Sequence, residues 1–284
     1  MAAAPIFPPD RVTIVGVLNL TPDSFSDGGR LLRDDGAPDL AAALASAQAL
    51  MRAGAHVLDV GGESTRPGAG EVPVALEIAR TCPVIEALAK ELPIPISIDT
   101  RKAAVAEAAL AAGARVVNDV SGLRHDPALA RVAGAAGAAL VLGHLRGEPA
   151  TMQQEVAFAD ALGEVAEELA ASKAQARALG FGGELVADPG LGFGKRLPHN
   201  LALLANLAEL RRRVGLPILV GPSRKAFLGE LTGDAVGERD LATAVVCGIA
   251  VFAGADAVRV HDVGGARRAV AIGAALRAAR RAPA

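Results

Sequence analysis

The chain of 284 residues contains no tryptophan and no tyrosine, and its only aromatic side chains besides histidine are seven phenylalanines. An aromatic contact with a ligand must therefore come from one of these few rings. The chain has only two cysteines, Cys82 and Cys247, which is too few for a disulfide-rich scaffold. We expect both to be reduced core residues of a cytosolic protein.

Charge of one sign and long apolar runs are also scarce. The formal net charge is -2, so no basic field exists that would attract nucleic acid or an anionic membrane. No run of about 18 uninterrupted apolar residues is present, which argues against a membrane span. Residues 1–10 also lack the pattern of a secretory signal. We therefore expect a globular cytoplasmic protein with no nucleic-acid partner and no membrane partner.

One short phrase recurs along the chain: a glycine next to alanine, then an apolar segment that ends in polar residues. Its glycines are Gly54, Gly113, Gly137 and Gly254. The phrase is typical of a helix that ends on a left-handed glycine, followed by a short turn and a buried strand. Four further segments have the strand-like part alone, and they are 11–19, 95–100, 184–190 and 217–224.

Amphipathic segments of helical length, rich in alanine and leucine, separate these strands. They are 38–53, 72–92, 101–112, 125–136, 155–179, 199–214, 236–253 and 264–281. Strands and helices that alternate eight times predict an α/β fold, the (β/α)8 TIM barrel. An open doubly wound sheet is the main alternative, but it usually has fewer strands. We expect a single domain over residues 1–284, with frayed ends at 1–10 and 280–284.

Polar side chains follow the predicted strands, and in a barrel these strand ends open on one face. Asp99, Asn118 and Asp188 suit a flat heterocycle, because a carboxylate can accept two parallel N–H bonds from such a ring. An isolated aspartate at a strand end is more often a helix cap than a catalyst, and we expect Asp119 and Asp262 to be caps or salt-bridge partners.

Two other groups of residues follow the strands. Arg66, Arg259 and His261 are suited to bind one anion, with Asn19 as a metal ligand and the backbone N–H groups of residues 264–265 as further donors. An apolar slot for a small aromatic ring is predicted from Phe25, Pro67 and Phe193, with Ser223 binding the carboxylate of that ring. His144 is expected to be a structural, hydrogen-bonded histidine.

Seven motifs, in this order, resemble those of the dihydropteroate synthase family over nearly the whole chain. They are NLTPDSFSDGG at 19–29, LDVGGESTRPG at 58–68, ISIDT at 96–100, VNDVSG at 117–122, DPGLGFGK at 188–195, GPSRK at 221–225 and RVHDV at 259–263. The resemblance implies a pterin-binding TIM-barrel transferase of folate biosynthesis. Such an enzyme condenses (7,8-dihydropterin-6-yl)methyl diphosphate with 4-aminobenzoate and releases diphosphate.

The same resemblance implies roles for individual residues. The pterin and its diphosphate are expected to contact Thr65, Asp99, Asn118, Asp188, Lys225, Arg259 and His261. The aminobenzoate is expected to contact Phe25, Asp27, Pro67, Phe193, Ser223 and Lys225. The residues expected to act in catalysis are Asp99, Arg66, His261 and Lys225. Mg²⁺ is the implied cofactor with Asn19 as its protein ligand, and the resemblance also implies a homodimer and sensitivity to sulfonamides.

The chain departs from the family pattern at the fifth strand, where Gly143 and Leu145 replace two methionines around His144. If Gly143 lines the pterin pocket, one apolar wall is thinner, which predicts weaker pterin binding. Two other functions compete with this transferase activity. A pterin-binding methyltransferase domain would have no use for Ser223 and Lys225, and a paralogue without turnover would not need the retained polar set.

Overall fold

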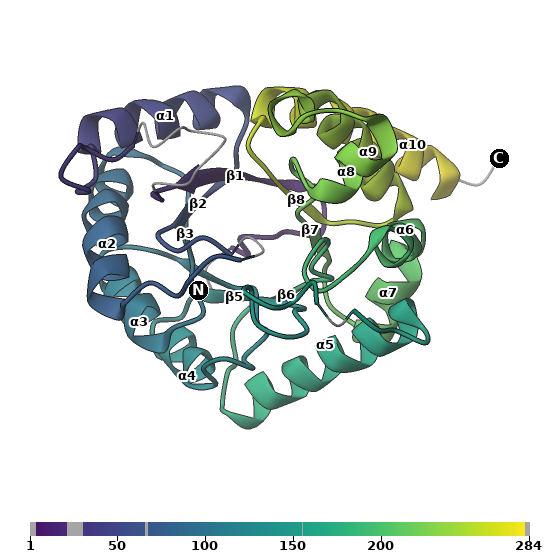
Figure 1. Cartoon of the computed structure of the whole chain (residues 1–284), viewed down its shortest axis with the longest axis horizontal. Coiled ribbons are helices and arrows are strands. Elements are labelled where there is room, and N and C mark those ends of the chain that lie inside the picture. The colour runs from purple at the N-terminus through teal and green to yellow at the C-terminus, as the bar shows by residue number, and fades with distance from the viewer. Residues whose placement is uncertain (1–3, 22–30, 66–67, 155, 282–284) are drawn as a thin grey trace.

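A computed structural model of the chain describes residues 4–21, 31–65, 68–154 and 156–281. Its parallel strands form a central sheet that the helices surround (Figure 1). The strands are β1 (Thr13–Asn19), β2 (Val57–Gly61), β3 (Ile96–Asp99), β4 (Val116–Asp119), β5 (Ala139–Gly143), β6 (Leu185–Asp188), β7 (Leu219–Val220) and β8 (Ala257–Val260). The helices are α1 (Leu40–Ala53), α2 (Val74–Glu91), α3 (Ala103–Ala111), α4 (Ala128–Ala135), α5 (Ala161–Ala178), α6 (Leu197–Ala205), α7 (Leu207–Val214), α8 (Ala226–Thr232), α9 (Asp240–Ala253) and α10 (Val263–Arg281).

The sheet closes on itself. Hydrogen-bonded neighbours run in the order β6-β5-β4-β3-β2-β1-β8-β7. The two ends of this order meet through a parallel bridge between Ala187 and Ile218, and the Ala187 N–H donates to the carbonyl of Pro217 at 2.9 Å. Closure confirms the predicted (β/α)8 barrel and excludes the open doubly wound sheet.

Residues that alternate along the strands fill the inside of the barrel. One buried cluster there contains Val15, Val57, Val141, Val186 and Phe7. Because side chains two residues apart share one face of a strand, the inward row continues toward the carboxyl ends of the strands. The residues of that continuation are Asn19, Asp59, Asn118, Gly143, Asp188 and Arg259. The barrel therefore has an apolar lower part and a polar mouth.

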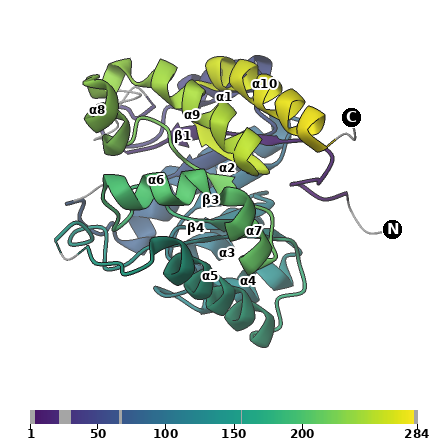
Figure 2. The same ribbon diagram turned by 90° about the vertical axis from the view of Figure 1, so that its right-hand side faces the viewer.

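Near both chain ends, the residues that the structure describes are more ordered than the sequence suggested. The N–H groups of Ile6 and Phe7 each donate to the Glu184 carboxylate at 2.9 Å, and Phe7 is 5% exposed. Helix α10 continues to Arg281. The expectation of frayed segments is therefore wrong for residues 6–7 and 280–281. In Figure 2, α8 lies at the left of the barrel and the end of α10 lies at the right.

The glycines of the repeated phrase have the predicted left-handed backbone. Gly54 has a φ of 112° and ends α1, where its N–H bonds the carbonyls of Leu50 and Met51. Gly254 has a φ of 125° and ends α9 in the same way. A residue with a Cβ is strained at such angles, so glycine is required where each helix turns back into its strand.

Two of the expected helices differ from the structure. The segment 199–214 is interrupted at Asn206, whose backbone leaves the helical region with a φ of -122° and a ψ of 30°. The segment 155–179 begins as a helix only at Ala161, because the Asp160 side chain accepts the N–H of Leu162 and caps α5 there. Cys82 and Cys247 are free thiols. In the described part of the chain, no helix is long and apolar enough to span a bilayer.

Candidate active site

A cavity of about 850 Å³ opens at the carboxyl ends of the strands. Eight residues singled out from the sequence line it, and they are Asn19, Thr65, Asp99, Phe193, Ser223, Lys225, Arg259 and His261. Phe25, Asp27, Arg66 and Pro67 lie outside the described residues. Elements from both halves of the chain thus bring the predicted residues to one cavity, as the polar strand ends require.

Arg259 joins two carboxylates in the polar mouth. Its Nε donates to Asp59 at 2.6 Å and its Nη2 donates to Asp99 at 2.7 Å. Asn118 is not among the lining residues, but its amide donates to the same Asp59 oxygen at 3.0 Å. The contact between Asp59 and Arg259 is not evident from the sequence, because β2 and β8 come close only by pairing with the two sides of β1.

Asp99 is 9% exposed and lies where its charge is poorly solvated. Burial raises the pKa of Asp99 to about 7 against the attraction of Arg259, and the neighbouring Asp59 and Glu77 add to the rise. A carboxylate under this constraint is stabilised by any ligand that brings N–H donors or positive charge to it. Asp99 is therefore suited to bind an electron-poor heterocycle.

A chain of hydrogen bonds connects the first, seventh and eighth strand ends. Asn19 Nδ2 lies 3.3 Å from His261 Nε2, and His261 Nδ1 lies 2.9 Å from the Ser223 hydroxyl. The backbone N–H of His261 also donates to that hydroxyl at 3.2 Å. The three side chains are thereby fixed relative to one another on one wall of the cavity.

Lys225 and Phe193 form a pair in the wall of the same cavity. The Lys225 ammonium lies 3.8 Å from the centre of the Phe193 ring, which is a close cation–π contact. Asp188 is not among the cavity-lining residues, but the charge of Lys225 acts on it. Burial raises the pKa of Asp188, and Lys225, Lys195 and Arg259 oppose the rise.

The loop that carries Phe193 is fixed from below by a buried lysine. Lys195 is 3% exposed, and its ammonium donates to the carbonyls of His144, Gly190 and Phe193 at 3.2, 3.1 and 3.0 Å. It also lies 2.8 Å from His144 Nδ1, while His144 Nε2 lies 3.1 Å from the Glu168 carboxylate. His144 is structural, as predicted. Lys195 was missed, because only the folded loop shows which carbonyls converge on it.

Burial lowers the pKa of His144 to about 4 and that of Lys195 to about 7. The geometry explains a neutral imidazole. Nδ1 accepts from the Lys195 ammonium, so the ring proton is on Nε2 and is donated to Glu168. A second ring proton would face that ammonium directly.

Two expectations about the wall of the site are wrong. The Gly265 N–H donates to Asp262 at 3.1 Å, so it caps α10 and is not directed at an anion. Gly143 does not leave an open space either. A Cβ there would lie 2.5 Å from Val120 Cα, so the Val120 backbone occupies the volume that a longer side chain would need. Asp119 caps the turn after β4 through the N–H groups of Ser121 and Leu123, as expected.

Comparison with known proteins places this geometry in a class. A family model described as "Pterin binding enzyme" matches residues 15–261, so the chain is a pterin-binding barrel protein. The dihydropteroate synthase of Mycobacterium leprae is 48% identical over 260 residues, which cover 89% of this chain and 89% of that protein. That of Synechocystis is 46% identical over 255 residues, covering 89% of this chain and 86% of the relative.

A solved structure supports the same assignment. The dihydropteroate synthase of Yersinia pestis, determined with a sulfonamide drug complex, superposes with a TM-score of 0.88 at 40% identity, and the match covers 95% of each chain. The chain belongs to the dihydropteroate synthase family, which is an enzyme family of the transferase class.

Proposed function

We propose that this chain condenses (7,8-dihydropterin-6-yl)methyl diphosphate with 4-aminobenzoate to give 7,8-dihydropteroate and diphosphate. The observation that carries the proposal is the set of side chains that lines one cavity. It combines the Asp99–Arg259 pair, suited to a pterin, with the Lys225–Phe193 pair, suited to an aromatic carboxylate. The membership of the family established above supports the same reaction.

Asp99 is the strand-end carboxylate that lines the pterin end of the cavity. Asp99 faces the electron-poor ring and stabilises the positive charge that develops on it, and Asn118 and Asp188 supply further acceptors. Arg259 keeps Asp99 and Asp59 from repelling each other in the absence of ligand. Thr65 is placed in the cavity wall to contact the substrate.

The diphosphate is bound beside Asn19, His261 and Lys225, with Arg66 as a further cation of the sequence prediction that lies outside the described residues. Among the described residues, no group of three histidine, cysteine or acidic side chains is suited to hold a metal by itself. This fits Mg²⁺, which keeps few protein ligands and binds through substrate phosphates. Asn19 would hold it through its amide oxygen, since the amide nitrogen faces His261. Bound there, Mg²⁺ would neutralise charge on the leaving diphosphate.

The aminobenzoate is held by Phe193 against its ring and by Ser223 and Lys225 at its carboxylate. Phe25, Asp27 and Pro67 complete this subsite in the sequence prediction. The reaction begins when the C–O bond between the pterin methylene and the diphosphate breaks, and Asp99 stabilises the resulting cation. The aromatic amine then forms the new C–N bond and loses a proton.

The test is an assay of diphosphate release with both substrates, with and without Mg²⁺. The proposal predicts release only when 4-aminobenzoate is present. A methyltransferase-type pterin-binding protein would release none, and a paralogue without turnover would bind the pterin and leave it intact. Release that is independent of 4-aminobenzoate would contradict the proposed condensation.

We also propose a cytoplasmic homodimer. Four apolar side chains on one face of α9 are exposed, namely Leu241 at 77%, Val245 at 52%, Ile249 at 56% and Phe252 at 38%. Ile272 and Leu276 extend this face on α10. A second copy of the chain, joined through this face, would remove the apolar surface from water. The two free thiols suit a reducing compartment.

A further inference from the structure

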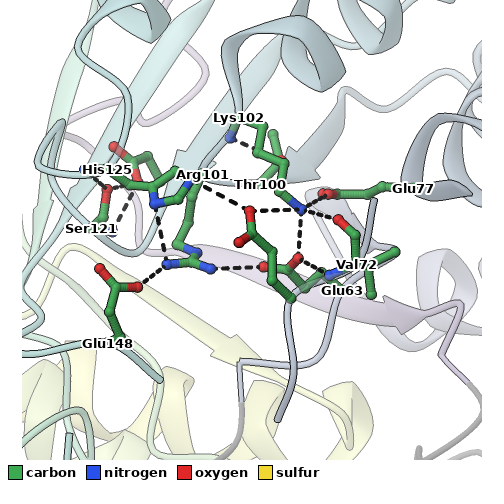
Figure 3. A network of polar contacts seen from close by, with 11 residues as sticks. Glu63, Val72, Glu77, Thr100, Arg101, Lys102, Ser121, His125 and Glu148 are labelled. Carbon is green, nitrogen blue, oxygen red and sulfur yellow. Dashed lines mark hydrogen bonds and ion pairs between the residues drawn. The ribbon is translucent and has the colours of Figure 1, made fainter. Parts of the chain in front are cut away.

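A group of buried charges lies under the loop that follows β2, outside the contacts assigned to substrate (Figure 3). The loop leaves the barrel at Glu63 and returns at Val72. The Val72 N–H donates to the Glu63 carboxylate at 2.8 Å, so the two ends of the loop are bonded to each other. Glu63, Ser64 and Thr65 all line the cavity.

Lys102 holds the same two ends from the neighbouring strand. Its ammonium donates to the Glu63 carboxylate at 2.5 Å, to the Val72 carbonyl at 2.6 Å and to the Glu77 carboxylate at 2.8 Å. All three ammonium protons are therefore used, and the Lys102 side chain is 7% exposed. Figure 3 shows the ammonium between the loop ends and Glu77.

Arg101 ties the loop to a second one. Its Nη2 donates to Glu63 at 3.1 Å, and its Nη1 donates at 2.6 Å to Glu148, which lies in the loop after β5. The Gly68 N–H reaches the Pro149 carbonyl of that second loop at 3.3 Å. Figure 3 shows Arg101 between the two carboxylates. Both cations directly follow Asp99 and Thr100, so one strand end supplies a ligand-facing carboxylate and the support of the adjacent loop.

Glu63 has a different role from Glu77 in this cluster. Burial alone would raise the pKa of Glu63, but the bonds from Lys102 and Val72 lower it, so the carboxylate is ionised. Glu77 contacts the same ammonium and is 1% exposed, but it belongs to α2, and in the described part of the chain its carboxylate makes no hydrogen bond to the loop ends. A buried ion pair is destabilised by the loss of one partner, so Glu63 and Glu77 both contribute to neutralising the Lys102 ammonium.

We propose that Glu63 and Lys102 are positioning residues that hold the base of the loop 64–71 and thereby fix Thr65 in the cavity wall. The proposal rests on the proposed function, because the position of Thr65 affects the reaction only if Thr65 contacts the substrate. Glu63 also lines the cavity, but its carboxylate oxygens are bonded to Val72, Arg101 and Lys102, so it acts on the reaction through the position of Thr65.

A double-mutant cycle tests this idea, with Glu63→Gln and its matched control Glu77→Gln. Each variant removes one charge from the same Lys102 ammonium and keeps the side-chain shape, but only Glu63→Gln weakens the loop base. We expect Thr65→Ala to lower kcat/KM by about tenfold in the wild-type and Glu77→Gln backgrounds. In the Glu63→Gln background it should cost less than about threefold, because Thr65 is already displaced. Equal factors in all three backgrounds would overturn the proposal.

Amide hydrogen exchange gives a readout that does not depend on turnover. A peptide covering residues 64–72 should exchange faster in Glu63→Gln than in the wild type, and at the wild-type rate in Glu77→Gln. Exchange at the wild-type rate in Glu63→Gln would contradict the positioning role even if the wild type were active. A wild type that forms no dihydropteroate but shows the expected exchange pattern would contradict the proposed function alone.

Discussion

Replacing Asp99 by asparagine separates the chemistry of the site from the stability of the barrel. Asp99 is buried, shares Arg259 with Asp59, and feels the charge of Glu77 as well. Asparagine keeps an oxygen that accepts from Arg259, while it removes one of the crowded negative charges. Arg259 still pairs with Asp59, so no unpartnered cation is created.

The structure gives the magnitude and sign of the stability change. Burial raises the pKa of Asp99 from 3.8 to about 7. The ionised form is therefore disfavoured in the folded protein, at a cost of about 4 kcal/mol. The cost is absent below pH 3.8, grows as the pH rises toward 7, and is complete above 7. Asp99→Asn should thus unfold at higher urea concentration than the wild type at pH 8, and the difference should vanish near pH 4.

The same substitution should abolish most of the activity. Removal of a charge that stabilises the transition state costs about 100-fold or more in turnover, which the diphosphate-release assay measures. Asp119→Asn is a matched control, since Asp119 is buried nearby but accepts backbone N–H groups and does not line the cavity. Its turnover should stay near that of the wild type. A destabilised Asp99→Asn variant at pH 8, or one with near-normal turnover, would refute the reasoning.

Three further predictions concern other parts of the chain. Because the pKa of His144 is lowered from 6.5 to about 4, the wild type should lose about 3 kcal/mol of unfolding free energy as the pH falls through that interval. His144→Asn should lack this slope in urea titrations, and an unchanged slope would contradict the neutral imidazole. A sulfonamide should compete with 4-aminobenzoate in steady-state kinetics, and an enzyme that keeps its turnover at saturating drug would disprove the subsite. The paired substitution of Leu241 and Ile249 by aspartate should turn a dimer into a monomer by sedimentation, whereas a monomeric wild type would exclude the dimer.

Local signals in the sequence were sufficient for the fold. Gly54 and Gly254 carry the positive φ that the repeated phrase predicted, and each precedes a strand of the barrel. The break at Asn206 was not predicted, because the amphipathic pattern continues through it. The helix ends there because the backbone angles of Asn206 leave the helical region, and tertiary packing rather than local propensity sets those angles.

Residues of the candidate site could be predicted where a polar side chain lies directly at the carboxyl end of a strand. Asp99, Arg259 and His261 were placed at the mouth because parallel strands bring their carboxyl ends to one face. The contacts of Lys195 and Lys102 were not predictable. Each lysine meets acceptors from different loops, and those loops become neighbours only when β5 pairs with β6 and β2 pairs with β3.

The most direct measurement of the central claim is the stoichiometry of product formation with both substrates and Mg²⁺ present. One equivalent of 7,8-dihydropteroate should form for each equivalent of diphosphate released, with 4-aminobenzoate incorporated through its amine. Diphosphate released without dihydropteroate, or no release at all, would contradict the account of this cavity as a site for both substrates.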